Sequence, residues 1–219
     1  MKETGLMFKA PLVRAILSGQ KTQTRRVVKG VALQWLDTDG FTPEFVASSE
    51  NHLSPMGQSG DRIYVRETWA EVARRQPLTD EDLPMRQDGR IVVYEADPHW
   101  HGTRQFLCAD GCIRWARPDR WKPSIHMRKG DARIWLEITG VRVERLQQIT
   151  EADCIAEGIE FFNNDRECGC KNYMDKTGKD WTLTAHQSFR SLWESTGGDW
   201  TANPYVWVID FKPTPKEPA

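Results

Sequence analysis

The chain has 219 residues, and its 30 Lys and Arg residues nearly balance 31 Asp and Glu. A net charge of -1 gives no global field that would attract a polyanion, so any nucleic-acid contact must be local. The amino-terminal segment has only short apolar runs broken by charges, so we expect no signal peptide, no membrane partner and a cytoplasmic location.

The first elements in chain order are a helix over 11–18 and a strand over 21–28. Pro11 suits a first helical turn, and Gly19 can adopt the positive φ of a helix C-cap. The segment 29–59 has no sustained period and is rich in Gly, Pro and Ser, so it is expected to be mostly loop.

The middle of the chain alternates strand patterns with a long irregular stretch. Period-two alternation predicts a strand over 62–72, and a second short strand follows at 91–96. Residues 97–131 are rich in Trp and Arg and are interpreted as an insertion. The run 132–146 predicts two strands joined by a turn at Gly140.

The last third contains two helices and a closing strand. Thr150 is a good N-cap and Gly158 a good terminator for the first helix. An amphipathic helix is expected over 185–194, and 205–212 reads as a strand that is apolar on both faces.

Short strands mixed with helices predict an α+β fold, a small and partly open β-barrel with flanking helices and long insertions. We expect a single domain over 1–212 and a disordered tail over 213–219. The insertions are placed at about 29–59, 97–131 and 160–182.

Two segments are locally basic. Five basic residues and no acid lie between Arg14 and Lys29, and seven basic residues against two acids lie between Arg114 and Arg133. Trp115 interleaves with the second segment, and indoles with guanidinium groups are suited to hold a stacked base and its phosphate. A solvated basic loop whose tryptophans pack on the core explains the same pattern equally well.

Lys21, Thr24 and Arg26 follow directly after the first predicted helix. In an extended strand Lys21 and Thr24 point to opposite faces, so they cooperate only if the chain bends between them. The alternative is an ordinary polar strand start whose long side chains reach solvent.

The run Gly-Gln-Lys-Thr-Gln-Thr-Arg-Arg at 19–26 resembles the GxKxxExR signature of the ASCH family, PUA-like barrels associated with RNA metabolism. Gly19, Lys21 and Arg26 match, while Thr24 replaces the usual Glu. With Thr at this position, the run is similar to the bacterial N4-acetylcytidine amidohydrolase branch of the family, in which the Thr works together with a Lys and a Glu. The equivalent Glu would be Glu157, in Thr-Glu-Ala-Asp-Cys-Ile-Ala-Glu.

Further stretches are similar to phage- and prophage-borne ASCH-like proteins, and they are spread over most of the chain. They read LVRAILSGQKTQTRRVVK, GDRIYVRETWAE, WKPSIHM, ITGVRVERLQQIT and NPYVWVIDF.

The resemblance implies acyl transfer without a required cofactor: Lys21 as base, Thr24 as nucleophile on an exocyclic amide, and Glu157 as orienting or proton-transferring acid. Arg26 and a backbone amide would stabilise the oxyanion. Glu157 also stands at the negative end of its predicted helix, which costs about 0.3–1 kcal/mol unless a cation such as Lys21 lies nearby. A Glu157 that faces water is the alternative.

Further candidates for substrate binding come from three stretches of the sequence. They are Arg25, Arg66, Glu67, Trp69, Lys122, Ser124 and His126. A structural network at Arg66 and Glu67 is the competing interpretation, because adjacent strand residues face opposite sides. His126 can equally be an ordinary histidine without a catalytic role.

Four of the five cysteines form two close pairs, which can complete a tetrahedral zinc site within the insertions. They are Cys108, Cys112, Cys168 and Cys170. The alternative is four free thiols, with Cys154 a buried apolar residue.

Three functions remain open at this point. The first is recognition of a nucleobase in RNA or of a free nucleoside, with amidohydrolase activity on N4-acylated cytidine as its enzymatic version. The second is a non-catalytic module that binds RNA or modified DNA, and the third is a ribonuclease.

Overall fold

The structure is a computed structural model that describes residues 1–38, 40–71, 92–97, 104–107, 113–116, 120–164, 171–174 and 181–216. The α-helices are α1 (Ala10–Leu17), α2 (Val31–Leu36), α3 (Pro43–Ala47), α4 (Glu151–Ala156) and α5 (Ala185–Ser195). The strands up to the middle of the chain are β1 (Glu3–Met7), β2 (Gln23–Val27), β3 (Arg62–Arg66), β4 (Trp69–Glu71), β5 (Val92–Tyr94), β6 (Arg104–Leu107) and β7 (Ile113–Ala116). The later strands are β8 (Trp135–Arg145), β9 (Phe161–Asn164), β10 (Lys171–Met174), β11 (Trp181–Thr182) and β12 (Tyr205–Thr214).

The largest sheet has five strands in the order β1-β3-β8-β12-β2. Its β2 and β12 strands are antiparallel, with Thr24 opposite Ile209 and Gln23 opposite Asp210. Smaller sheets have the orders β11-β10-β9, β4-β5 and β6-β7. The α+β class is therefore confirmed. Among the described strands this sheet ends at β1 and β2 and is not closed, so the barrel stays a prediction.

The predicted helices and their caps are confirmed. Helix α1 ends before Gly19, which has φ +76°. Thr150 accepts a hydrogen bond from the Asp153 amide at the start of α4, and Gly158 after its end has φ +90°. Local signals suffice here because capping depends on side chains within one helical turn.

One expectation about the chain's course is incomplete and another is wrong. Most described residues of 29–59 are loop, as expected, but the segment also contains α2 and α3, because helices of five and six residues are too short to show a period. Gly140 is not a turn but lies inside the continuous strand β8. A Cβ at Gly140 would lie 3.2 Å from a carboxylate oxygen of Asp210, so this glycine marks a close approach of two strands.

The predicted strand over 62–72 is interrupted between β3 and β4, and the strand over 91–96 is observed as β5. Strand β12 confirms the closing strand, with Val206–Ile209 buried in succession on both faces. The predicted insertion 97–131 contains β6, β7 and two short 3-10 helices among its described residues.

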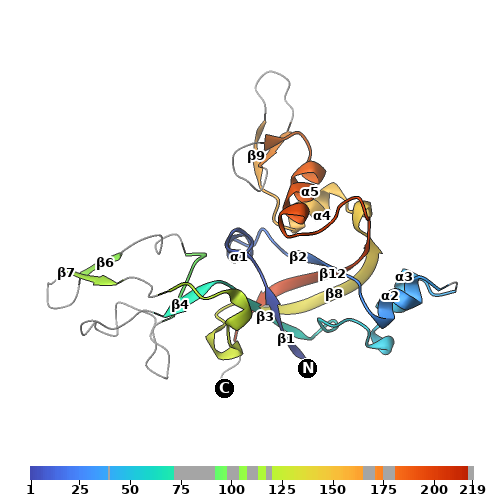
Figure 1. Ribbon diagram of the computed structural model, residues 1–219, viewed down its shortest axis with the longest axis horizontal. Helices are drawn as coiled ribbons and strands as arrows, with labels where there is room; N and C mark the ends of the chain where they lie inside the picture. Colours follow the sequence, from blue (N-terminus) through green and yellow to red (C-terminus); the bar gives the residue numbers. More distant parts are fainter. Residues whose placement is uncertain are drawn as a thin grey trace. The chain divides into compact units, whose positions relative to one another are not determined.

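The chain divides into two compact units. Unit 1 comprises Met1–Thr4, Ala15–Ile63 and Leu136–Pro215, and unit 2 comprises Gly5–Arg14, Tyr64–Trp135 and Lys216–Ala219. Within unit 1, α4 contacts both α5 and β2 (Figure 1).

Unit 2 contains a small cluster of buried apolar residues. It consists of Trp69, Val92, Tyr94, Met127 and Ala132, with Tyr64 packed against it. The cluster holds the Trp69 side chain in place, and Trp69 also lines the pocket described below. None of the helices in the described part of the chain has the length and apolar character that a membrane crossing requires.

Candidate functional site

In unit 1 the chain turns back after α1 and places Lys21 against α4. The Lys21 amide donates to the Ala15 carbonyl, and the Thr22 amide donates to the Ala156 carbonyl. The Lys21 ammonium donates to Glu157 Oε2 at 2.6 Å, to the Glu157 carbonyl and to the Gln23 carbonyl. The side chains of Lys21 and Glu157 are 0% and 5% exposed, so this is a buried ion pair.

Gly158 allows this contact. Its φ of +90° suits glycine, and a Cβ there would lie 3.1 Å from the Ala15 Cβ and 3.3 Å from the Lys21 Cβ. Helix α4 thereby ends directly against Lys21, and the cation expected to offset Glu157 at the negative helix end is present.

Arg25 extends the charged cluster. Its guanidinium contacts Glu144 at 2.6 Å, Asp153 at 3.4 Å and Glu157 at 3.3 Å, and it also donates to the Gln23 side chain. The Arg25 side chain is only 1% exposed. With both Lys21 and Arg25 paired, the cluster satisfies its buried charges internally.

Thr24 makes a different contact. Its hydroxyl accepts a hydrogen bond of 3.0 Å from Arg26 Nη1, whereas Arg25 donates to the Gln23 side chain. Both contacts join residues two positions apart, because alternate side chains of a strand lie on the same face. Burial lowers the pKa of Arg26, and the charge of Glu157 opposes that shift. The structure thus brings Lys21 and Glu157 together and joins Thr24 to Arg26. Thr24 is only 1% exposed.

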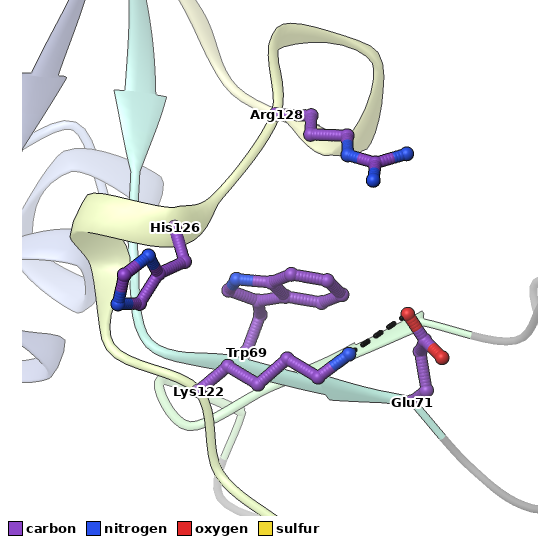
Figure 2. A pocket seen from close by; sticks show the side chains of 5 residues that line it. All are labelled: Trp69, Glu71, Lys122, His126 and Arg128. Carbon is purple, nitrogen blue, oxygen red and sulfur yellow. Dashed lines mark hydrogen bonds and ion pairs between the residues drawn. The ribbon is translucent and has the colours of Figure 1, made fainter.

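An open pocket lies in unit 2 (Figure 2). It has a volume of about 370 Å³ and is lined by Trp69, Glu71, Lys122, His126 and Arg128. Trp69 forms its floor, held in place because its backbone exchanges two hydrogen bonds with that of Lys122. The Lys122 ammonium lies 4.5 Å from the centre of an indole ring and 3.0 Å from Glu71 Oε1.

Three of the predicted pocket residues, Arg66, Glu67 and Ser124, do not line the pocket. Arg66 donates to the carbonyls of Ser124 and Ile125 and so anchors the segment that carries His126. The carboxylate of Glu67 accepts from Arg133 Nε at 3.0 Å and from a second guanidinium nitrogen at 3.1 Å. Arg66 and Glu67 therefore have different partners, because adjacent residues of an extended chain point to opposite sides.

Glu67 is buried, and this has an electrostatic consequence. Burial raises the pKa of Glu67, although the hydrogen bonds and the charge of Arg133 act in the opposite direction. The carboxylate is 1% exposed, whereas Arg133 is 25% exposed, so the cost of burial is borne mainly by Glu67.

Sequence reasoning missed two residues that line the pocket, Glu71 and Arg128. Glu71 follows Trp69 at the spacing that places side chains on one strand face, which was an available signal. Arg128 lies in the second basic segment, but no local pattern distinguished it from its basic neighbours.

The zinc prediction cannot be followed in the structure. Cys108, Cys112, Cys168 and Cys170 lie outside the described residues. The described part of the chain contains no group of three or more His, Cys, Asp or Glu side chains placed to hold a metal. Cys154 is buried, as expected, and burial raises its pKa to about 12.

Comparison with known proteins yields little. No protein-family model matches this chain, and no curated protein matches it. A crystal structure of an ASCH domain from Lactobacillus crispatus JV V101 is similar at 13% identity and a TM-score of 0.35, covering 97% of this chain and 79% of that one. Similarity at that level identifies neither a fold nor an activity.

Proposed function

We propose that this protein binds a nucleobase, in RNA or in a free nucleotide, by stacking it on Trp69 in the pocket of unit 2. The observation that carries the proposal is a pocket of about 370 Å³ lined by Trp69 and by cationic side chains; Trp69 is 4% exposed, so a base stacks on the indole only when the side chains that cover it move aside. A base stacked on an aromatic ring gains about 1–3 kcal/mol, and Lys or Arg beside the ring can hold its phosphate.

The sequence supports the same function. The ASCH-like motif at Gly19, Lys21 and Arg26 resembles proteins associated with RNA metabolism. The pocket residues Trp69, Lys122 and His126 come from two further stretches, GDRIYVRETWAE and WKPSIHM, that are similar to phage-borne ASCH-like proteins. We therefore propose that the chain is an ASCH-type, PUA-like protein whose ligand enters at Trp69.

The test is equilibrium binding of short single-stranded RNA and of 5′-mononucleotides, measured by calorimetry. Trp69→Ala is expected to weaken binding about tenfold to a hundredfold. Because Trp69 also belongs to the core of unit 2, Arg128→Ala serves as a second variant on an exposed side chain. Arg14→Ala removes another exposed arginine outside the pocket and is the matched control.

Unchanged affinity in both Trp69→Ala and Arg128→Ala would contradict the proposal. An equal loss in Arg14→Ala would also contradict it, because binding would then follow overall charge and not the pocket.

Amidohydrolase activity on N4-acylated cytidine is a second candidate, favoured by the 2.6 Å contact between Lys21 and Glu157. In this mechanism the Thr24 oxygen attacks the acyl carbon and its proton passes to Lys21. As the C–N bond breaks, Lys21 returns that proton to the cytosine amine, and a water molecule then hydrolyses the acyl ester on Thr24. Lys21 already donates three hydrogen bonds, so it must first transfer a proton to Glu157. Lys21 and Thr24 are also buried, so a substrate reaches them only if the chain opens.

This activity is tested by following N4-acetylcytidine hydrolysis by chromatography. Activity that Thr24→Val abolishes, and that Thr22→Val at a neighbouring exposed threonine preserves, would support Thr24 as nucleophile. Absence of turnover in the wild type would remove this candidate and leave the binding function intact.

A further inference from the structure

Helix α2 has two apolar faces, although packing on a core requires only one. Ala32 and Leu36, four residues apart, are buried. Val31 and Trp35, which are also four residues apart, lie on a different side of the helix and remain accessible to solvent. The core therefore does not explain the second apolar face.

The turn between α2 and α3 adds two phenylalanines to this face. Gly40 lies in the turn with φ +102°, which favours glycine, and Thr42 begins α3 by accepting a hydrogen bond from the Phe45 amide. The ring centre of Trp35 lies 5.1 Å from that of Phe41 and 5.9 Å from that of Phe45. Helices α2 and α3 lie side by side (Figure 1). One short segment thus gathers three aromatic rings.

Val31, Trp35, Phe41 and Phe45 form what we call the aromatic patch, and much of it is open to solvent. Val31 is 53% exposed, Phe45 46% and Phe41 37%. Single exposed apolar residues are common, whereas several in contact mark a surface that binds a partner. Aromatic side chains are enriched in such surfaces because each buries a large apolar area.

The charges of the same segment indicate which partner fits. Residues 30–59 contain four acids and no Lys or Arg. Of these acids, Asp37 follows α2 directly and Glu44 precedes Phe45 in α3, and both are exposed. Hydrogen bonds from its own backbone amide and from Thr42 lower the pKa of Glu44, so its carboxylate is ionised at neutral pH.

This charge disfavours two kinds of partner and favours a third. A nucleic acid is a polyanion, which the carboxylates repel. A second copy that met the same patch across a two-fold axis would bring like charges together. A cation, in contrast, is attracted both to carboxylates and to the faces of aromatic rings.

We propose that the aromatic patch binds another protein, through a basic segment that carries arginine beside apolar side chains. Arginine fits best because its planar guanidinium stacks on aromatic rings and also pairs with carboxylates. The patch lies wholly within unit 1, whereas the Trp69 pocket lies in unit 2. This inference therefore goes beyond the proposed binding of a nucleobase and does not rest on it.

The test is fluorescence anisotropy of a labelled peptide of four Leu-Pro-Arg repeats, titrated with the full chain. Proline keeps the peptide extended. A second peptide with Glu in place of Arg is expected to bind at least about tenfold more weakly, because its charges repel those of the patch. Binding of the Arg peptide is expected to weaken at high salt, since exposed charges are screened.

Matched variants locate the peptide on the protein. Phe45→Ser and Phe41→Ser are each expected to weaken binding of the Arg peptide about tenfold, as an aromatic contact central to an interface does. Leu183→Ser is the control, because Leu183 is exposed and apolar but lies outside the patch. Glu44→Gln is expected to weaken binding about twofold to fivefold, and Glu160→Gln, at another exposed acid, should have no effect. Thermal melting of each variant checks that it is folded.

The inference is overturned by undetectable binding of the Arg peptide or by equal binding of the Glu peptide. Unchanged affinity in both Phe45→Ser and Phe41→Ser also overturns it, because the peptide would then bind elsewhere. Self-association in sedimentation that Phe45→Ser abolishes would assign the patch to a second copy, and RNA binding that Phe45→Ser abolishes would assign it to nucleic acid. Nucleotide binding that depends on Arg128 is a separate result, so the proposed function can hold in each case.

Discussion

The two units each contain a Lys–Glu pair, and the pairs differ in burial. Lys21 and Glu157 are 2.6 Å apart with side chains 0% and 5% exposed, whereas Lys122 and Glu71 are 3.0 Å apart with side chains 41% and 38% exposed. A buried pair must keep its partners because a lone buried charge is costly. A half-exposed pair is stabilised little and can exchange a partner for a ligand. The comparison shows that the first pair is the one whose loss costs stability, whereas the second lies where the proposed ligand would bind.

The largest expected effect tests the buried pair. Glu157→Gln leaves Lys21 without its carboxylate and is expected to reduce the free energy of unfolding by about 3–5 kcal/mol, as measured by urea denaturation. Glu71→Gln is the counterpart in unit 2 and is expected to change it by less than about 1 kcal/mol. Similar losses in the two variants would break the comparison.

A double-mutant cycle sharpens the same contrast with an intermediate effect. The cycle of Lys21→Met with Glu157→Gln is expected to give a coupling energy of about 1–3 kcal/mol, because the two groups share a buried network. The cycle of Lys122→Met with Glu71→Gln is expected to give about 0–1 kcal/mol, and less at high salt because exposed charges are screened. A coupling energy for the exposed pair as large as that of the buried one would contradict this prediction.

The smallest expected effect is a pH dependence of the unfolding free energy, which arises from Glu67, a buried carboxylate of unit 2. Its pKa is raised by burial, so the folded state binds this proton more tightly than the unfolded state does. The resulting stabilisation is full below the usual glutamate pKa and is lost as the pH rises through the raised value. Relative to Glu67→Gln, the wild type should therefore lose unfolding free energy as the pH rises above about 4.5.

The measurement is the difference in unfolding free energy between wild type and Glu67→Gln from pH 4 to pH 8. Glu50→Gln, at an exposed position, is the control and should show no such trend. A difference that grows in favour of the wild type with rising pH would show that Arg133 outweighs the burial of Glu67.

Part of the site could be predicted from local sequence. Lys21 and Glu157 were named together through the family resemblance, and the position of Glu157 at the end of a helix required a nearby cation. Trp69, Lys122 and His126 were candidates for the pocket and do line it. Glu71 was missed although its spacing from Trp69 was an available signal, and Arg128 was missed because no local pattern distinguished it from its basic neighbours.

Capping residues and short-range patterns by themselves determined the helices at Ala10–Leu17, Glu151–Ala156 and Ala185–Ser195, because caps and amphipathic faces act within a few residues. Tertiary structure decided what no local pattern contains. It set Lys21 against Glu157, more than a hundred residues apart, and it carried the β8 strand straight through Gly140 beside Asp210. It also distinguished the two Lys–Glu pairs. The pairs have the same residue types, so sequence alone cannot separate them, whereas their burial depends on how distant elements pack.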